Sequence, residues 1–297
     1  MSSTPQAPLI AVEMLDDRIA DLGCVFMLLL NYVQLRYEDI NADGGVFFVG
    51  WNKWRWGEPK EGAQPHVGTA RQAWGSLSSL VAQAVRRSAP ERLRQLEGPS
   101  ELFRRIIEHD DERGAPAASV DGIRVAVSEA LNEVRELLHG LPSAHGPGGR
   151  LLVPDTNALL YKPELADWTP PDGPWTVVLV PQVLRELDQI KMRPNELGKK
   201  ADGVIRRIKE YSRRGDTFVS VRISDLLAMR EVAIDPDMAS TLPWLQAGHA
   251  DDELLASALE LRGDNLNAAL ALATRDRNLQ NKARLASVPY LDVEFDL

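Results

Sequence analysis

From residue 150 onward, short apolar runs alternate with segments that have the periodicity of helices. The apolar runs span residues 151–153, 175–180, 217–221, 268–273 and 289–293. Between most of them, apolar residues recur at three- and four-residue spacing, as in Val183, Leu187 and Ile190. Short apolar strands that alternate with helices are typical of a parallel sheet covered on both faces. This half of the chain is therefore predicted to fold as an α/β sandwich.

The residues before this region have a different pattern. Apolar positions at helical spacing occupy residues 14–36, 67–86, 90–96, 100–109 and 119–139. An aromatic segment at residues 47–57 fits a strand or a loop. Residues 141–149 combine two prolines and three glycines, which is typical of a break between domains. The sequence predicts a mainly helical N-terminal domain at residues 1–145, with no indication of its role, and an α/β domain at residues 150–297.

The composition is that of an ordinary globular protein. Of the 297 residues, 44% are hydrophobic and 26% are charged, which argues against disorder and against a membrane protein. No apolar segment reaches the length of a bilayer span. Cys24 is the only cysteine, so an intrachain disulfide and a thiolate zinc site are excluded. A reducing cytoplasm is the expected compartment.

Four acidic residues lie where an apolar run gives way to a helical pattern: Asp155, Glu186, Asp252 and Asp276. The carboxyl ends of parallel strands lie along one edge of a sheet, so carboxylates that are distant in sequence can meet there. Four such groups within a few ångströms repel one another unless a cation neutralises them. Mg²⁺ and Mn²⁺ prefer oxygen ligands of this kind. The pattern therefore predicts a site for a hard metal.

Each of the three aspartates, taken alone, is also typical of a helix cap, where a carboxylate accepts hydrogen bonds from free amide groups. Glu186 does not fit that interpretation, because it lies one turn inside its helix at the edge of the apolar stripe. An unpaired carboxylate at the edge of a buried face is costly unless it has a partner. The joint arrangement favours a common site over four separate caps.

The motifs around these acids resemble the PIN-domain nuclease family in their order, spacing and flanking apolar residues. They are Asp155-Thr156-Asn157, Glu186-Leu187-Asp188, Asp251-Asp252 followed by Leu254-Leu255, and Ala273-Thr274-Arg275-Asp276-Arg277-Asn278-Leu279. The resemblance covers about residues 150–297, half of the chain. It implies a Rossmann-like three-layer α/β/α sandwich around a parallel sheet, preceded here by the helical domain, and metal-dependent cleavage of RNA.

The resemblance places the catalytic and metal-binding acids of the family at Asp155, Glu186, Asp252 and Asp276. The three aspartates would bind Mg²⁺ or Mn²⁺ directly or through water, and Glu186 would complete the shell or orient the attacking water. Asp251 is the alternative to Asp252, which we favour because the following pair of leucines then has the offset of the family. Polar support for the carboxylates is expected from Thr156, Asn157 and Thr274.

The charge distribution leaves room for a polyanionic substrate despite a formal net charge of −9. Between Lys191 and Arg214, nine Lys and Arg residues face three Glu and Asp residues, a local charge of +6. The predicted phosphate contacts are Lys191, Lys199, Lys200, Arg206, Arg275 and Arg277. A solvated helix face explains the same basic run equally well. Trp51, Trp54 and Trp56 could stack unpaired bases, but a role in the core of the N-terminal domain is favoured.

The sequence thus predicts a metal-dependent endoribonuclease that acts on single-stranded RNA and whose chemistry would serve for DNA as well. Two alternatives stay open: a catalytically silent RNA-binding or scaffold protein, and the toxin component of a toxin–antitoxin pair. A homo-oligomer and a regulatory protein partner are both compatible with the sequence. A dehalogenase fold fits less well, because Asn157 occupies the place of its second aspartate. A receiver fold also fits less well, because this sequence has neither the acidic pair near the end of the first strand nor the lysine at a late strand that a receiver needs.

Overall fold

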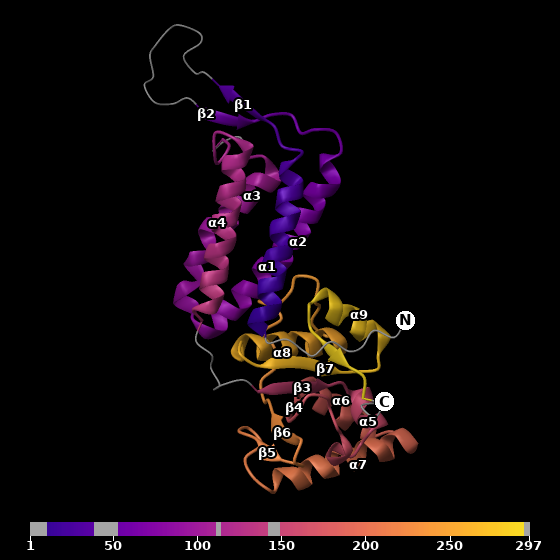
Figure 1. Cartoon of the computed structure of the whole chain (residues 1–297). Coiled ribbons are helices and arrows are strands. Elements are labelled where there is room, and N and C mark those ends of the chain that lie inside the picture. Colours follow the sequence, from indigo (N-terminus) through magenta and orange to yellow (C-terminus); the bar gives the residue numbers. More distant parts are fainter. Residues whose placement is uncertain (1–10, 39–52, 111–113, 142–148, 294–297) are drawn as a thin grey trace. The chain divides into compact units, whose positions relative to one another are not determined.

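The computed structural model describes residues 11–38, 53–110, 114–141 and 149–293. The chain forms two compact units (Figure 1). One unit extends from Leu15 to Pro142. The other consists of Ser143–Leu297 together with the start of the first helix, up to Met14. None of the described helices is long and apolar enough to cross a lipid bilayer.

The N-terminal unit is helical, as predicted. Its elements are α1 (Ala11–Leu30), α2 (Ala63–Ser88), η1 (Pro90–Leu96), α3 (Glu97–Glu108) and α4 (Val120–His139), with a hairpin of β1 (Leu35–Glu38) and β2 (Lys53–Trp56). Apolar stripes at helical spacing supply its core, in which Ile19, Leu77, Phe103 and Ile123 are buried. The amphipathic pattern of the sequence is therefore used to bury one face of each helix against the others.

Trp56 belongs to the core of this unit. Its side chain is 3% exposed, its ring stacks on His109 with 4.9 Å between the centroids, and its indole donates a hydrogen bond of 3.2 Å to the carbonyl of Asp110. Trp54 is half-buried and lies edge-on to Tyr37, whereas Trp51 lies outside the described residues. The core interpretation of the aromatic segment therefore holds for Trp56, which is not available for stacking on a base.

The C-terminal unit contains a six-stranded sheet with the order β5-β6-β4-β3-β7-β8. Its strands are β3 (Arg150–Pro154), β4 (Trp175–Leu179), β5 (Val221–Arg222), β6 (Leu227–Glu231), β7 (Ala269–Ala273) and β8 (Tyr290–Leu291). Neighbouring strands are parallel except for the edge strand β5, which is antiparallel to β6. The predicted fold class is confirmed: a helical region is followed by a mostly parallel sheet with helices.

Five α-helices connect these strands: α5 (Thr156–Tyr161), α6 (Pro181–Lys191), α7 (Glu196–Ser212), α8 (Ala250–Asp264) and α9 (Arg277–Leu285), with the short η2 (Leu165–Asp167) after α5. The chain moves from β3 through β4 to β6 and then crosses to β7 and β8 on the other side of β3. Because such crossovers are right-handed, this reversal places α8 and α9 on the opposite face of the sheet from α5, α6 and α7. Figure 1 shows α8 and α9 beside β7, and α7 at the other side of the sheet.

The reversal at β3 fixes where a ligand can bind. In open parallel sheets the crevice lies outside the carboxyl ends of the strands, at the point where the strand order reverses. Here that point lies between β3 and β7, which are paired from Arg150 and Ala269 to Pro154 and Ala273. Residues that follow these two strands are therefore brought together whatever their separation in sequence.

The sequence patterns missed β6 and overestimated the strand before it. Residues 217–220 form a turn around Asp216, whose carboxylate accepts a hydrogen bond of 2.9 Å from the amide of Phe218. The strand β5 that follows is only two residues long. The apolar character of β6 is hidden because it ends in Arg230 and Glu231. The side chains of these two residues point to opposite faces of the sheet, and both are half-buried at the end of the strand.

The corner between α6 and α7 requires a glycine. Asn195 caps α7 and accepts a hydrogen bond of 3.0 Å from the amide of Gly198. A Cβ atom at position 198 would lie 2.1 Å from the carbonyl oxygen of Arg193. That oxygen belongs to the backbone of the corner, so it cannot move away without distorting the connection between the two helices.

Gly198→Ala is therefore expected to destabilise the C-terminal unit by about 1–3 kcal/mol, the usual cost of an overpacked site. Gly203→Ala, in the same helix, is the matched control. Its added Cβ would lie 3.5 Å from the Arg207 guanidinium, an ordinary contact, and the better helix propensity of alanine should stabilise the unit by about 0.5–1 kcal/mol. Urea unfolding measures both effects, and a shift of the same sign in the two variants would contradict this account of the corner.

Candidate metal centre

Asp155 follows β3 directly and is almost fully buried, with 6% of its surface exposed. Its amide donates a hydrogen bond of 3.0 Å to the carbonyl of Ala273, so the pairing of β3 with β7 continues up to the crevice. Its Oδ1 accepts a hydrogen bond of 2.5 Å from the amide of Ala158 and so caps α5. The capping role and the place in the predicted site thus belong to the same residue.

Thr274 connects the ends of β3 and β7 through its side chain. It is fully buried, and its hydroxyl donates a hydrogen bond of 2.5 Å to Oδ2 of Asp155. The same hydroxyl oxygen accepts a hydrogen bond of 3.0 Å from the amide of Asp276. Thr274 therefore holds the Asp155 carboxylate and the start of α9 in a fixed relation.

Asp276 caps α9. Its Oδ1 accepts hydrogen bonds from the amides of Asn278 and Leu279, at 2.7 and 3.1 Å. Its other carboxylate oxygen accepts no hydrogen bond from any described residue. The side chain is half-buried, so this second oxygen is available to a ligand in the crevice.

The electrostatics of Asp155 show which other acids share its surroundings. Burial, and to a lesser degree the charges of Asp276 and Asp251, raise the pKa of Asp155 to about 6, against the hydrogen bonds from Thr274 and Ala158 that lower it. Two carboxylates, one that follows β7 and one that begins α8, therefore act on the carboxylate that follows β3. The hydrogen bonds of Thr274 show that the ends of β3 and β7 are joined, and a common site for the acids stays a prediction.

The neighbouring acids Asp251 and Asp252 differ in their contacts. Asp252 is 5% exposed, and its two oxygens accept hydrogen bonds from the ammonium of Lys282 at 2.7 Å and from the amide of Gln246 at 3.1 Å. Asp251 is half-buried and more loosely held, by Asn278 at 3.2 Å and Lys282 at 3.5 Å. The charge of Asp251 is among those that raise the pKa of Asp155.

Lys282 is a residue of this site to which the sequence patterns gave no role. Burial by itself would lower its pKa, but the hydrogen bond to Asp252 and the charges of Asp251 and Asp252 outweigh that effect and raise it. Lys282 lies six residues after Asp276 in the sequence, in α9. Its place in the helix that follows Asp276 could have indicated that Lys282 lies near the acidic residues. Nothing in the sequence indicates which carboxylate it contacts.

Glu186 reaches the site indirectly. It is half-buried on α6, and one of its oxygens accepts a hydrogen bond from the hydroxyl of Thr156, the residue after Asp155. Asn157 is exposed at the start of α5. The structure therefore links Glu186 to the end of β3 through Thr156, while the supporting role of Asn157 stays a prediction.

The chemistry of these side chains fits a hard dication, since three carboxylates repel one another and Asp276 has an oxygen without a hydrogen bond. The spacing is less favourable. Within residues 11–38, 53–110, 114–141 and 149–293, no three His, Cys, Asp or Glu side chains are close enough to hold an ion together. Asp251 would have to turn away from Asn278 and Lys282 to join Asp155 and Asp276 around a cation.

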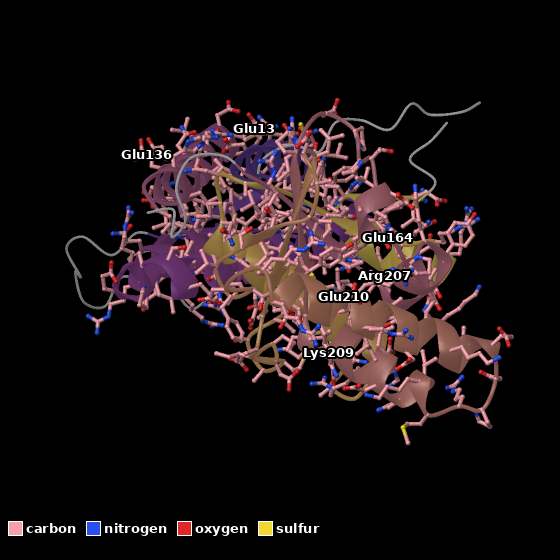
Figure 2. All side chains as sticks on the ribbon, turned by 90° about the horizontal axis from the view of Figure 1, so that it is seen from below. Glu13, Glu136, Glu164, Arg207, Lys209 and Glu210 are labelled. Carbon is pink, nitrogen blue, oxygen red and sulfur yellow. The ribbon has the colours of Figure 1, made fainter. Side chains whose placement is uncertain are left out.

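The basic residues predicted to contact phosphates are mostly paired on helix surfaces. Lys191 contacts Asp188, Lys199 contacts Glu196 at 2.7 Å, and Arg206 contacts Asp202 at 3.1 Å. Arg207, beside them on α7, contacts Glu164 at 2.6 Å, and Figure 2 shows these two residues close together. Exposed pairs of this kind contribute little to stability and can be exchanged for phosphate contacts.

The remaining predicted phosphate contacts differ among themselves. Lys200 makes no ion pair with a described residue, and neither does the exposed Arg277. Arg275 lies over the ring of Tyr161, 4.1 Å from its centroid, and 3.6 Å from Asp292. The contacts favour a solvated helix surface for most of the basic run, and the binding of nucleic acid by these residues stays a prediction.

Comparison with known families supports the resemblance that the motifs indicate. Residues 152–294 match the model of the family described as PIN domain. This is a nuclease-type family whose members typically bind divalent metals. The match includes all four predicted acids and Lys282. No curated protein matches the sequence significantly.

Proposed function

We propose, from the premise that residues 152–294 are a PIN domain, that this protein is a metal-dependent nuclease that hydrolyses phosphodiester bonds in single-stranded RNA. The observation that carries the proposal is the arrangement at the end of β3: the buried Asp155 carboxylate accepts a hydrogen bond from the hydroxyl of Thr274, whose oxygen accepts one from the amide of Asp276. Burial and the charges of Asp276 and Asp251 also raise the pKa of Asp155. A group of carboxylates that destabilise one another is a poor structural element. It becomes favourable when a cation occupies the crevice.

In this proposal Asp155, Asp251 and Asp276 would hold Mg²⁺ or Mn²⁺. The bound ion would activate a water and offset the charge that develops on the scissile phosphate. Thr274 would keep the Asp155 carboxylate in place through the hydroxyl hydrogen bond. The spacing to the following leucines favours Asp252 as the metal ligand. We assign this role to Asp251 instead, because the carboxylate of Asp252 is engaged by Lys282 and by the amide of Gln246.

Glu186 would orient the attacking water. Its carboxylate is held by Thr156, next to Asp155, and lies on a different helix from the three aspartates. A carboxylate that is fixed by a hydroxyl but keeps a second oxygen can accept a hydrogen bond from water. This role needs no direct contact with the cation, which agrees with the indirect link that the structure shows.

The test is cleavage of an unstructured, end-labelled RNA oligonucleotide. Cleavage is expected with Mg²⁺ or Mn²⁺ and none in EDTA. Asp276→Asn should reduce the rate by about a hundredfold or more, the size of effect found when a group that stabilises the transition state is removed. Asp202→Asn, an exposed carboxylate on α7, is the matched control and should leave the rate unchanged.

Cleavage that continues in EDTA, or an Asp276→Asn variant as active as the wild type, would refute the proposal. A DNA oligonucleotide of the same sequence tests the choice of RNA. Cleavage of DNA at an equal rate would widen the substrate to single strands in general. Binding of the RNA without cleavage under either metal would favour the catalytically silent alternative.

A further inference from the structure

A tyrosine ring lies beside the candidate metal centre, in contact with the segment that follows β7. Arg275 stands between Thr274 and Asp276 in this segment, and its guanidinium carbon lies 4.1 Å from the centroid of the Tyr161 ring. Thr274 donates a hydrogen bond to the Asp155 carboxylate, and Asp276 caps α9. The contact with Arg275 therefore places the Tyr161 ring next to residues that belong to the acidic site.

Helix α5 leads from the acidic site to the same ring. It begins directly after Asp155 and ends at Tyr161. Residues 158–160 are buried, whereas Asn157 and Tyr161 are exposed. Residues four apart lie on one face of a helix, so the exposed face of α5 extends from the crevice to the ring. A helix rises about 1.5 Å per residue, so roughly 9 Å separate Asp155 from Tyr161 along it.

The ring is exposed but firmly supported. Tyr161 keeps 52% of its surface exposed although the guanidinium of Arg275 lies over its ring. The chain just after it is fixed, because the indole of the fully buried Trp168 donates a hydrogen bond of 2.9 Å to the carbonyl of Lys162. The amide of Lys162 in turn donates one of 3.0 Å to the carbonyl of Ala158. An aromatic side chain on such a support loses little conformational freedom when it binds a ligand.

Arg275 has the contacts of a residue that orients the ring. Its guanidinium lies over Tyr161 on one side and 3.6 Å from the carboxylate of Asp292 on another. A planar cation is attracted to the face of an aromatic ring, and a carboxylate next to it keeps it in place. These contacts favour a positioning role for Arg275 over the phosphate contact that its sequence position suggests.

We propose that Tyr161 stacks on an unpaired base of the RNA strand that the acidic site cleaves. This inference rests on the proposed nuclease function and identifies what the site recognises beside the scissile phosphate. Every base has a flat face that can stack on an aromatic side chain, so the contact carries little sequence information. Bases within a duplex already stack on their neighbours. The ring therefore selects single strands without selecting a sequence.

The test is equilibrium binding of a fluorescently labelled ten-residue oligouridylate, measured by anisotropy with Mg²⁺. The measurement uses Asp276→Asn protein, in which cleavage is expected to be lost. Adding Tyr161→Ala should weaken binding by about tenfold or more, the size of effect of one stacked base. Tyr161→Phe keeps the ring and should change binding by less than about twofold.

Tyr290→Ala is the matched control. Tyr290 on β8 also lies under an arginine, with Arg284 5.4 Å from its centroid, but this pair does not adjoin the acidic residues. Its loss should leave RNA binding unchanged. Because Tyr161 is exposed, its variants are expected to fold normally, and thermal unfolding checks all three proteins.

An oligonucleotide with a single abasic position separates stacking from a general structural effect. One such position should weaken binding to the protein with Tyr161 by about tenfold and leave binding to Tyr161→Ala unchanged, because the two changes remove the same contact. Abasic positions that weaken binding equally in both proteins would show that Tyr161 contacts no base. In otherwise wild-type protein, Tyr161→Ala should raise KM and change kcat little, since the ring does not touch the reacting atoms.

The salt dependence of binding tests the role of Arg275. Arg275→Gln should weaken binding without changing the slope of the logarithm of affinity against the logarithm of salt concentration, because the ring loses its support and no phosphate contact is lost. A slope reduced by about 0.7, the value for one phosphate contact on a single strand, would overturn the positioning role.

Failure of this inference and failure of the proposed function are distinguishable. Cleavage by the wild type together with equal binding by Tyr161→Ala and Tyr161→Phe overturns the inference and leaves the nuclease intact. RNA binding that depends on Tyr161, in a wild type that cleaves nothing, overturns the proposed function alone. RNA that is neither bound nor cleaved overturns both.

Discussion

Asp155→Asn is expected to raise the stability of the C-terminal unit at pH 7 in the absence of divalent metal. Burial, and to a lesser degree the charges of Asp276 and Asp251, raise the pKa of Asp155 to about 6 from an ordinary value of 3.8. The folded state therefore favours the protonated acid. The contribution of this carboxyl group to the free energy of unfolding is fully present below its ordinary pKa of 3.8. It is lost as the pH rises through the folded-state pKa of about 6. The loss at pH 7 amounts to at most about 3 kcal/mol.

Asparagine carries no charge and removes this penalty, although it replaces the hydroxyl contact with Thr274 imperfectly. We expect a gain of about 1–3 kcal/mol at pH 7, equivalent to a rise in Tm of several degrees. At pH 4 most of the difference should disappear, because the wild-type carboxyl is then protonated in the folded state. Differential scanning calorimetry in EDTA at the two pH values measures the effect.

Added Mn²⁺ should reverse the order. The ion binds the folded wild type and stabilises it by mass action, whereas Asp155→Asn has lost a ligand and should gain little. Asp202→Asn serves as the control, since it removes an equal charge from an exposed position on α7. A variant that is less stable than the wild type at pH 7 in EDTA would contradict the claim that burial and the charges of Asp276 and Asp251 disfavour the ionised Asp155.

Asp252→Asn is expected to reduce stability far more than Asp251→Asn, although the two residues are adjacent. Asp252→Asn removes the carboxylate closest to the half-buried ammonium of Lys282 and weakens the acceptor of the Gln246 amide. Breaking a buried pair costs about 3–5 kcal/mol, and the partial exposure of Lys282 reduces this to roughly 2–3 kcal/mol. Asp251→Asn should cost little, because it relieves the repulsion on Asp155 and leaves Lys282 paired with Asp252.

Metal binding should show the reverse pattern. Asp251→Asn is expected to weaken the binding of Mn²⁺ by about tenfold or more, the effect of losing a charged ligand, and Asp252→Asn, if folded, should bind with little change. Urea unfolding gives the stability, and titration followed by electron paramagnetic resonance gives the affinity for Mn²⁺. If Asp252→Asn removes metal binding and keeps full stability, the register favoured by the leucine offset is correct and our assignment of Asp251 is wrong.

The sequence allowed the place of the site to be predicted because that place follows from topology. Once strands and helices alternate, Asp155 and Asp276 must lie at one edge of the sheet, and pairing of β3 with β7 brings them together. Thr274 was predicted as support for the carboxylates for the same reason. The contact with Thr156 that brings Glu186 to this edge depends on how α6 packs, and the sequence indicates only that Glu186 needs a partner.

The choice between Asp251 and Asp252 could not be derived from the sequence. Successive residues of a helix point about 100° apart, so the two carboxylates have different neighbours, and Lys282 lies closer to Asp252 than to Asp251. Lys282 belongs to α9 and lies 30 residues from Asp252 in the chain. Which carboxylate is neutralised therefore depends on the packing of α9 against α8. The leucine offset contains no information about that packing.

The sequence also did not allow prediction of the cavity of about 520 Å³ at the amino-terminal edge of the sheet. Arg222 and Ala228, which line this cavity, come together through β5 and β6, of which the first is short and antiparallel and the second was not predicted. A cavity whose lining depends on strand order and on an edge strand can be recognised only in the structure.

The central claim is that Asp155, Asp251 and Asp276 form one site for a divalent cation at the carboxyl edge of the sheet. Anomalous diffraction from a crystal soaked in Mn²⁺ tests it most directly. We predict a strong peak in contact with the carboxylates of Asp155 and Asp276, with Asp251 turned toward it. A crevice that stays empty while Mn²⁺ is bound elsewhere on the molecule would contradict the claim.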